Sequence, residues 1–70
     1  MQQAIVEGKI VKIGDTVGFK CDIEQSGTIT KIRRIFHLVE LTLENPHGFS
    51  GDYIGGRTIT TALATECWID

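Results

Sequence analysis

The feature that most constrains the fold is a run of strict alternation at residues 17–24. The apolar face of this run comprises Val17, Phe19, Cys21 and Ile23. The opposite face comprises Gly18, Lys20, Asp22 and Glu24. A period of two residues is that of a half-buried β-strand. The dipeptide Gly14-Asp15 immediately before the run predicts a turn.

The rest of the chain also favours short strands. β-Prone residues predict further strands at residues 4–13, 28–36, 37–43, 57–61 and 66–70. Gly8 predicts a bulge or bend in the first of these. A short loop is expected at residues 25–27, a second bulge or turn at Arg33-Arg34, and a single helical turn at residues 61–64.

Length and spacing predict one all-β domain. Seventy residues make a single domain, and a chain this short buries only about 60% of its unfolded surface. Five or six strands at this spacing predict a closed or half-closed barrel. Trp68 is expected in its core, against Val17 or Leu41. Residues 1–12 either complete the barrel as an added strand or protrude from it.

Three segments resemble the SH3-like small barrels, a group that includes KOW and Tudor modules. Residues 13–19 resemble the x-G-D-x-V start of the first barrel strand, and residues 27–32 the strand that follows. Residues 59–69 resemble the closing strand, short turn and last strand. The resemblance covers residues 13–70. It implies a five- or six-stranded barrel with a short 3-10 turn before the last strand.

The order of these segments is also similar to that of the plasmid-borne type II dihydrofolate reductases. Those enzymes form their active site in the central pore of a tetramer, with a Val-Gln-Ile-Tyr segment before the closing turn. This chain has Arg57-Thr58-Ile59-Thr60 at the comparable place and retains only the Ile. The resemblance therefore does not carry the activity to this chain.

Composition and residue spacing argue against several classes of function. The net charge of −2 argues against a general nucleic-acid coat or a membrane-surface binder. No signal peptide or membrane span is recognisable, so two free thiols in a reducing cytoplasm are expected. No metal or other cofactor is predicted, because the potential ligands are scattered singly: Cys21, His37, His47 and Cys67.

The strongest candidate for a binding surface is a glycine-rich loop at residues 45–57. Long loops in small domains are often functional. The expected partner-binding residues are His47, Phe49, Asp52, Tyr53 and Arg57. One alternative is that Phe49 or Tyr53 packs back onto an open barrel end, and another is that residues 52–54 add a short strand. A hydrolase triad of His47, Ser50 and Asp52 is not predicted, because three residues within six positions rarely reach the required geometry.

A second candidate surface is the basic cluster of Lys31, Arg33 and Arg34. These side chains have the charge to contact phosphates, and Phe36 and His37 offer rings for stacking on exposed bases. The alternative is an ordinary charged hairpin that discourages edge-to-edge strand pairing.

The sequence therefore favours a small non-enzymatic interaction module that binds a protein partner through residues 45–57. Short free-standing chains of this kind are typical of accessory proteins of phages, plasmids or gene cassettes. Three alternatives remain open. They are a nucleic-acid-binding barrel that uses residues 31–34, a small oligomeric enzyme or ligand binder with an intersubunit site, and a structural subunit whose residues 1–12 add a strand to a neighbour.

Overall fold

The structure is a computed structural model that describes residues 1–70, and it confirms an all-β chain. The strands are β1 (Gln3–Val6), β2 (Lys9–Lys12), β3 (Thr16–Cys21), β4 (Ile23–Ile35), β5 (Leu38–Glu44), β6 (Ile59–Leu63) and β7 (Trp68–Ile69). A single 3-10 turn, η1 (Ala64–Glu66), precedes the last strand, as the sequence predicts.

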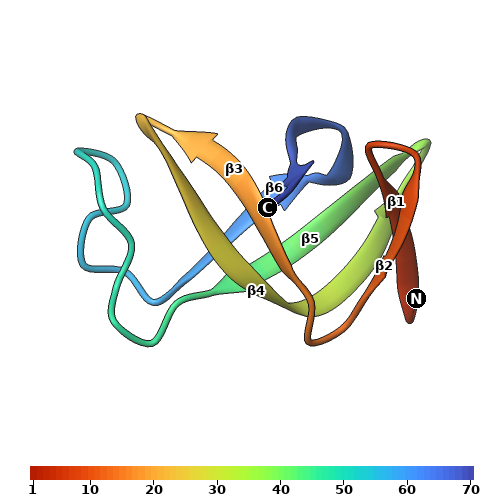
Figure 1. Ribbon diagram of the computed structural model, residues 1–70, viewed down its shortest axis with the longest axis horizontal. Coiled ribbons are helices and arrows are strands. Elements are labelled where there is room, and N and C mark those ends of the chain that lie inside the picture. The colour runs from red at the N-terminus through yellow and green to blue at the C-terminus, as the bar shows by residue number, and fades with distance from the viewer.

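The strands form two antiparallel sheets (Figure 1). β1 and β2 make a two-stranded hairpin, and the other five strands follow the order β6-β5-β4-β3-β7. The larger sheet curls strongly, but its outer strands β6 and β7 are not paired with each other, so the sheet is not closed into a barrel. The β1–β2 hairpin packs on the domain rather than protruding from it, because Ala4, Val6 and Val11 belong to the hydrophobic core.

Tight turns set the boundaries of the first five strands. The turn expected at Gly14-Asp15 is confirmed, with Gly14 at φ 97°. The prediction of a loop at residues 25–27 is wrong, because these residues belong to β4 and pair with β3. The chain reverses earlier, at Asp22. Asp22 has φ 71°, a conformation that Asp tolerates better than most residues.

Gly8 belongs to a hairpin turn and not to a bulge within one strand. Glu7 and Gly8 have φ 52° and 76°, the pattern of a two-residue type I′ turn. The Glu7 carboxylate accepts a hydrogen bond from the Ile69 backbone N–H at 2.5 Å. The same turn therefore ties the first hairpin to the last strand.

The irregularity expected at Arg33-Arg34 lies earlier in β4. Both arginines are regularly paired with β5, and the register shifts instead between Ile29 and Lys31. The elements near the C-terminus also begin a few residues later than predicted. β6 begins at Ile59, and the helical turn occupies η1 because β6 still pairs with β5 as far as Leu63.

Trp68 is half-buried and covers Gly18, not the predicted Val17 or Leu41. Gly18 and Trp68 are paired residues of β3 and β7. A Cβ atom built on Gly18 would overlap three atoms of the indole ring, so the ring occupies the space that any other side chain would need. A glycine on the predicted polar face of the strand thus creates the site for the only tryptophan.

Candidate functional site

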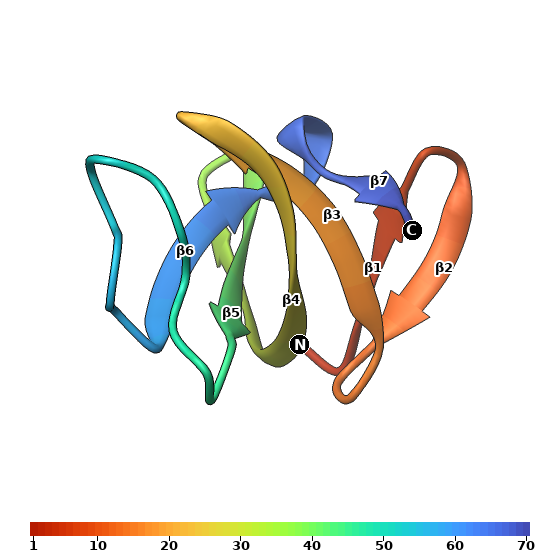
Figure 2. The ribbon, with the colours of Figure 1, turned by 60° about the vertical axis from the view of Figure 1, so that its left-hand side comes forward.

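Loop 45–57 lies at one end of the molecule, and the β1–β2 hairpin lies at the other (Figures 1 and 2). The loop folds on itself through backbone hydrogen bonds. The Phe49 N–H donates to the Arg57 carbonyl at 2.7 Å, and the Gly56 N–H donates to the Phe49 carbonyl at 2.9 Å. The loop is therefore a folded part of the structure, although it contains no strand, and residues 52–54 form a turn.

Two side chains from the β3–β4 hairpin fasten the loop to the sheet. The Gln25 amide donates to the Ser50 carbonyl at 3.0 Å and accepts from the Ser50 N–H at 2.9 Å. The Asp22 carboxylate accepts a hydrogen bond from the Asp52 N–H at 2.9 Å. A side-chain amide that pairs with both backbone groups of one residue acts as a substitute for a neighbouring strand.

Phe49 is only 3% exposed and belongs to the hydrophobic core. Its ring meets that of Phe19 edge to face, with centroids 5.5 Å apart. It also lies directly over Gly27, where a Cβ atom would come within 3.3 Å of the Phe49 ring. The prediction that Phe49 contacts a partner is therefore corrected. Phe49 packs back onto the sheet, which is the alternative that the sequence left open.

The other predicted residues of the loop stay at the surface. Tyr53 is 80% exposed and lies in the turn at residues 52–56. The side chains of His47, Asp52 and Arg57 are exposed as well. Neither Asp52 nor Arg57 takes part in an ion pair within the chain. The fastened loop thus carries an exposed aromatic ring and charged side chains of both signs that form no ion pair within the chain.

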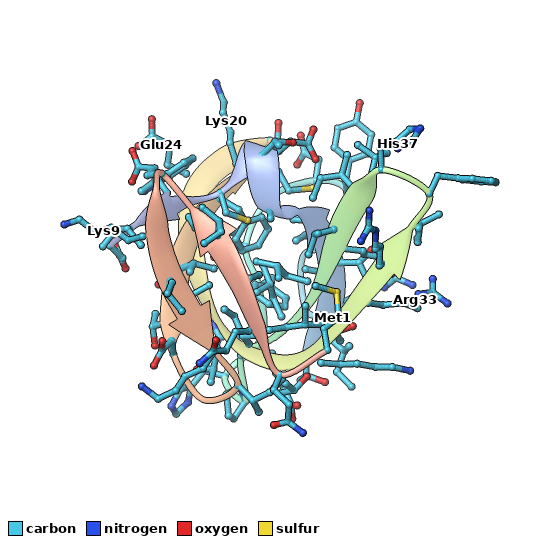
Figure 3. The ribbon with its side chains drawn as sticks, turned by 90° about the vertical axis from the view of Figure 1, so that its right-hand side faces the viewer. Met1, Lys9, Lys20, Glu24, Arg33 and His37 are labelled. Atoms are coloured by element: carbon cyan, nitrogen blue, oxygen red, sulfur yellow. The ribbon has the colours of Figure 1, made fainter.

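The basic cluster does not form one continuous surface. Consecutive residues of a strand point to opposite faces, so Arg33 and Arg34 diverge. The Arg33 guanidinium pairs with Glu40 at 3.0 Å, and Figure 3 shows Arg33 pointing away from the molecule. The Arg34 guanidinium donates to the Phe36 carbonyl at 3.1 Å. Of the three basic residues, only Lys31 has no side-chain ion pair or hydrogen bond within the chain.

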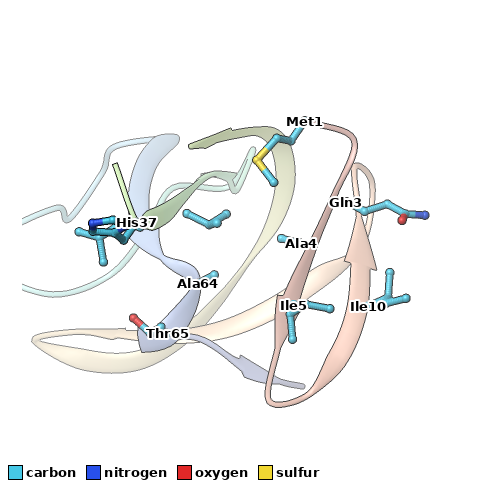
Figure 4. Close-up of a pocket in the computed structure, with 10 residues that line it drawn as sticks. Met1, Gln3, Ala4, Ile5, Ile10, His37, Ala64 and Thr65 are labelled. Carbon is cyan, nitrogen blue, oxygen red and sulfur yellow. The ribbon is translucent and has the colours of Figure 1, made fainter. Parts of the chain in front are cut away.

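A surface that the sequence did not predict is an apolar groove of about 380 Å³ at the opposite end from loop 45–57 (Figure 4). It lies between β1 on one side and η1 with the start of β5 on the other. The lining residues are Met1, Gln3, Ala4, Ile5, Ile10, His37, Leu38, Val39, Ala64 and Thr65. No lining side chain is an Asp, Glu, Lys or Arg.

One pattern in the sequence indicates this groove weakly. In residues 4–6, and again at Ile10-Val11, apolar side chains occupy consecutive positions and therefore both faces of a strand. Ala4 and Val11 turn inward, whereas the paired Ile5 and Ile10 are exposed. A strand that is apolar on both faces indicates that something covers each face.

Both cysteines are free in the structure. Burial, followed by the nearby charge of Glu66, raises the pKa of the Cys67 thiol from 9.0 to about 11. The thiolate is the reactive form. Cys67 is therefore poorly suited to act as a nucleophile near neutral pH.

This raised pKa predicts a loss of stability in alkali. The folded state holds the Cys67 proton up to a higher pH than the unfolded state does. The free energy of unfolding therefore has its full value with respect to Cys67 below pH 9, and it falls as the pH rises from 9.0 toward 11. Urea unfolding at several pH values measures this change. The Cys67→Ala variant should show a shallower fall over the same interval; an identical fall would rule out Cys67 as its source.

Comparisons with protein-family models, with curated proteins and with solved structures gave no match. The resemblance to SH3-like barrels therefore stays a prediction. No group of three or more His, Cys, Asp and Glu side chains lies close enough together to hold a metal ion. No helix in the chain has the length and apolar character needed to cross a membrane.

Proposed function

We propose that the chain is a small non-enzymatic interaction module that binds a protein partner through loop 45–57. The observation that carries this proposal is the position of Tyr53, which is 80% exposed on a loop fastened by Gln25 and Asp22. Tyrosine is enriched at protein interfaces because it offers a large contact area with few rotatable bonds. Arg57 and Asp52 add charged groups that are free to pair with a partner.

The fastening of the loop supports this function energetically. Ordering a flexible loop on binding costs free energy, which is subtracted from the affinity. In this chain the core residue Phe49 and the hydrogen bonds to Ser50 hold the loop before any partner arrives. Phe49 thus has a supporting role in the proposed site, and Tyr53 replaces it as the aromatic anchor.

The test is a measurement of affinity with a purified partner. Affinity capture from the native host identifies the partner, and a calorimetric titration then compares the wild-type chain with Tyr53→Ala. We expect a loss of affinity of at least about tenfold, because aromatic anchors at interfaces commonly contribute more than 1 kcal/mol.

Phe36→Ala serves as the matched control. Phe36 is 88% exposed, and it lies in the turn between β4 and β5, at the end of the molecule opposite Tyr53. Its replacement should leave the affinity unchanged. Equal affinities of the wild-type chain and Tyr53→Ala would exclude the tyrosine as an anchor.

The wider setting belongs to the same proposal. We propose a cytoplasmic accessory protein of a phage, plasmid or gene cassette, built on an SH3-like scaffold. The free thiols of Cys21 and Cys67 agree with a reducing compartment. The ion pair of Arg33 with Glu40 and the divergence of Arg33 and Arg34 make the nucleic-acid alternative less favourable.

A further inference from the structure

The apolar groove and its rim form an uncovered hydrophobic surface. The exposed fractions of Met1, Ile5, Ile10, Phe36 and Leu38 lie between 44% and 88%. Phe36 directly precedes the lining residues His37 and Leu38 in the chain, so its backbone adjoins the edge of the groove. Figure 3 shows Met1 between the two hairpins that border this surface. A contiguous exposed apolar patch of this kind marks an interaction site.

Phe36 occupies a backbone position that does not suit it. It is the first of two residues that connect β4 to β5, and its φ is 56°. Two-residue hairpins with positive φ at this position usually have Gly there, because a Cβ atom is disfavoured. A bulky aromatic residue in this conformation destabilises the folded chain. The aromatic ring is therefore better explained by a contact outside the chain than by the fold.

We propose that a second copy of this chain covers the groove. The two copies meet about a two-fold axis, and Phe36 of each copy inserts its ring into the apolar groove of the other. A two-fold interface needs a projection and a matching hollow on the same face of the chain. The exposed Phe36 and the groove meet this requirement in the proposed dimer, because the turn that carries Phe36 leads directly into the lining residues His37 and Leu38.

The dimensions agree with this arrangement. A cavity of about 150 Å³ is sufficient for benzene, and the groove measures about 380 Å³. The five exposed side chains offer on the order of 500 Å² of surface. A standard interface buries about 800 Å² on each partner, so these side chains supply more than half of it.

The uncharged lining and the short chain both favour self-association. No lining side chain is an Asp, Glu, Lys or Arg, and the α-ammonium group of the lining residue Met1 donates to the Ile32 carbonyl at 3.3 Å within the chain. A chain of 70 residues gains stability from any additional burial, and association is one of the common ways to obtain it. This inference is independent of the proposed function, because loop 45–57 lies at the other end of the molecule and stays free in the dimer (Figure 1).

The test is sedimentation equilibrium of the whole chain from about 10 μM to 1 mM, a range that detects micromolar to millimolar dissociation constants. We expect a monomer–dimer equilibrium for the wild-type chain. Phe36→Gly should raise the dissociation constant at least about 100-fold, because the ring is lost twice at a two-fold interface. The same variant should unfold at an equal or higher temperature than wild type when both are monomeric, since Gly suits the turn.

Two further variants complete the experiment. Ile10→Ser removes an exposed side chain of the groove and should also weaken the dimer. Tyr53→Ser removes an exposed aromatic ring at the other end and should leave the dimer intact. A wild-type chain that stays monomeric at the highest concentration overturns the proposal. So does a dimer that persists unchanged in Phe36→Gly and Ile10→Ser, because a different face would then hold the copies together.

Discussion

Replacing Phe49 by Ala is expected to lower the free energy of unfolding by about 3–5 kcal/mol, the usual loss when a buried Phe is truncated. Phe49 fills the space above Gly27 and meets Phe19 edge to face, so its removal leaves a cavity between the loop and the sheet. A core of this size rarely supplies more than 3–5 kcal/mol in total. The variant should therefore be largely unfolded at 25 °C.

Urea unfolding followed by circular dichroism measures this loss, with Phe49→Leu as a milder variant that keeps most of the apolar volume. Tyr53→Ala is the matched control, because it removes an aromatic ring from the same loop at an exposed position. Surface substitutions of this kind usually change stability by less than about 0.5 kcal/mol. Similar unfolding midpoints for Phe49→Ala and Tyr53→Ala would show that Phe49 is not part of the core.

Replacing Gly18 by Ala is expected to cost about 2 kcal/mol, within the usual range for inserting an extra methyl group into a packed region. The new methyl group would overlap the indole of Trp68, so the ring must leave its place on β3. Trp68 is the only tryptophan, and its fluorescence reports the movement directly. We expect an emission maximum shifted to longer wavelength together with a lower unfolding midpoint.

A double-mutant cycle separates this clash from any effect of Ala on the strand. In the Trp68→Ala background the obstructing ring is absent, so adding Gly18→Ala should cost much less than it does in the wild-type chain. Residues in contact typically show interaction energies of about 0.5–3 kcal/mol in such cycles. Strict additivity of the two substitutions would contradict the proposed packing of Trp68 over Gly18.

The alternating pattern at residues 17–24 correctly predicts a strand but conceals a turn. β3 ends at Cys21, and β4 begins at Ile23 after the single residue Asp22. Because Cys21 and Ile23 are paired across this turn, the alternation of residue types continues through it. Periodicity alone cannot locate a reversal that inserts only one residue. The actual turn has a positive φ at Asp22, a conformation that Asp tolerates but that the presence of an Asp does not by itself predict.

The two aromatic residues of loop 45–57 show why a loop is easier to predict than its contacts. Phe49 and Tyr53 occupy similar glycine-rich surroundings in the sequence, but only Phe49 is buried. The burial of Phe49 depends on Gly27 and Phe19, which are distant from it in the sequence and lie beside it only in the folded structure. The apolar groove was missed for the same reason, since it joins residues 1–10 to residues 37–39 and 64–65.

The central claim is that loop 45–57 is folded onto the sheet before any partner binds. Amide hydrogen exchange of the free chain tests it most directly, at residues whose N–H groups have a defined acceptor. The N–H groups of Phe49, Ser50 and Gly56 should exchange as slowly as those of the neighbouring strands, because each donates a hydrogen bond. Exchange of all three at the rate of an unstructured peptide would contradict the claim.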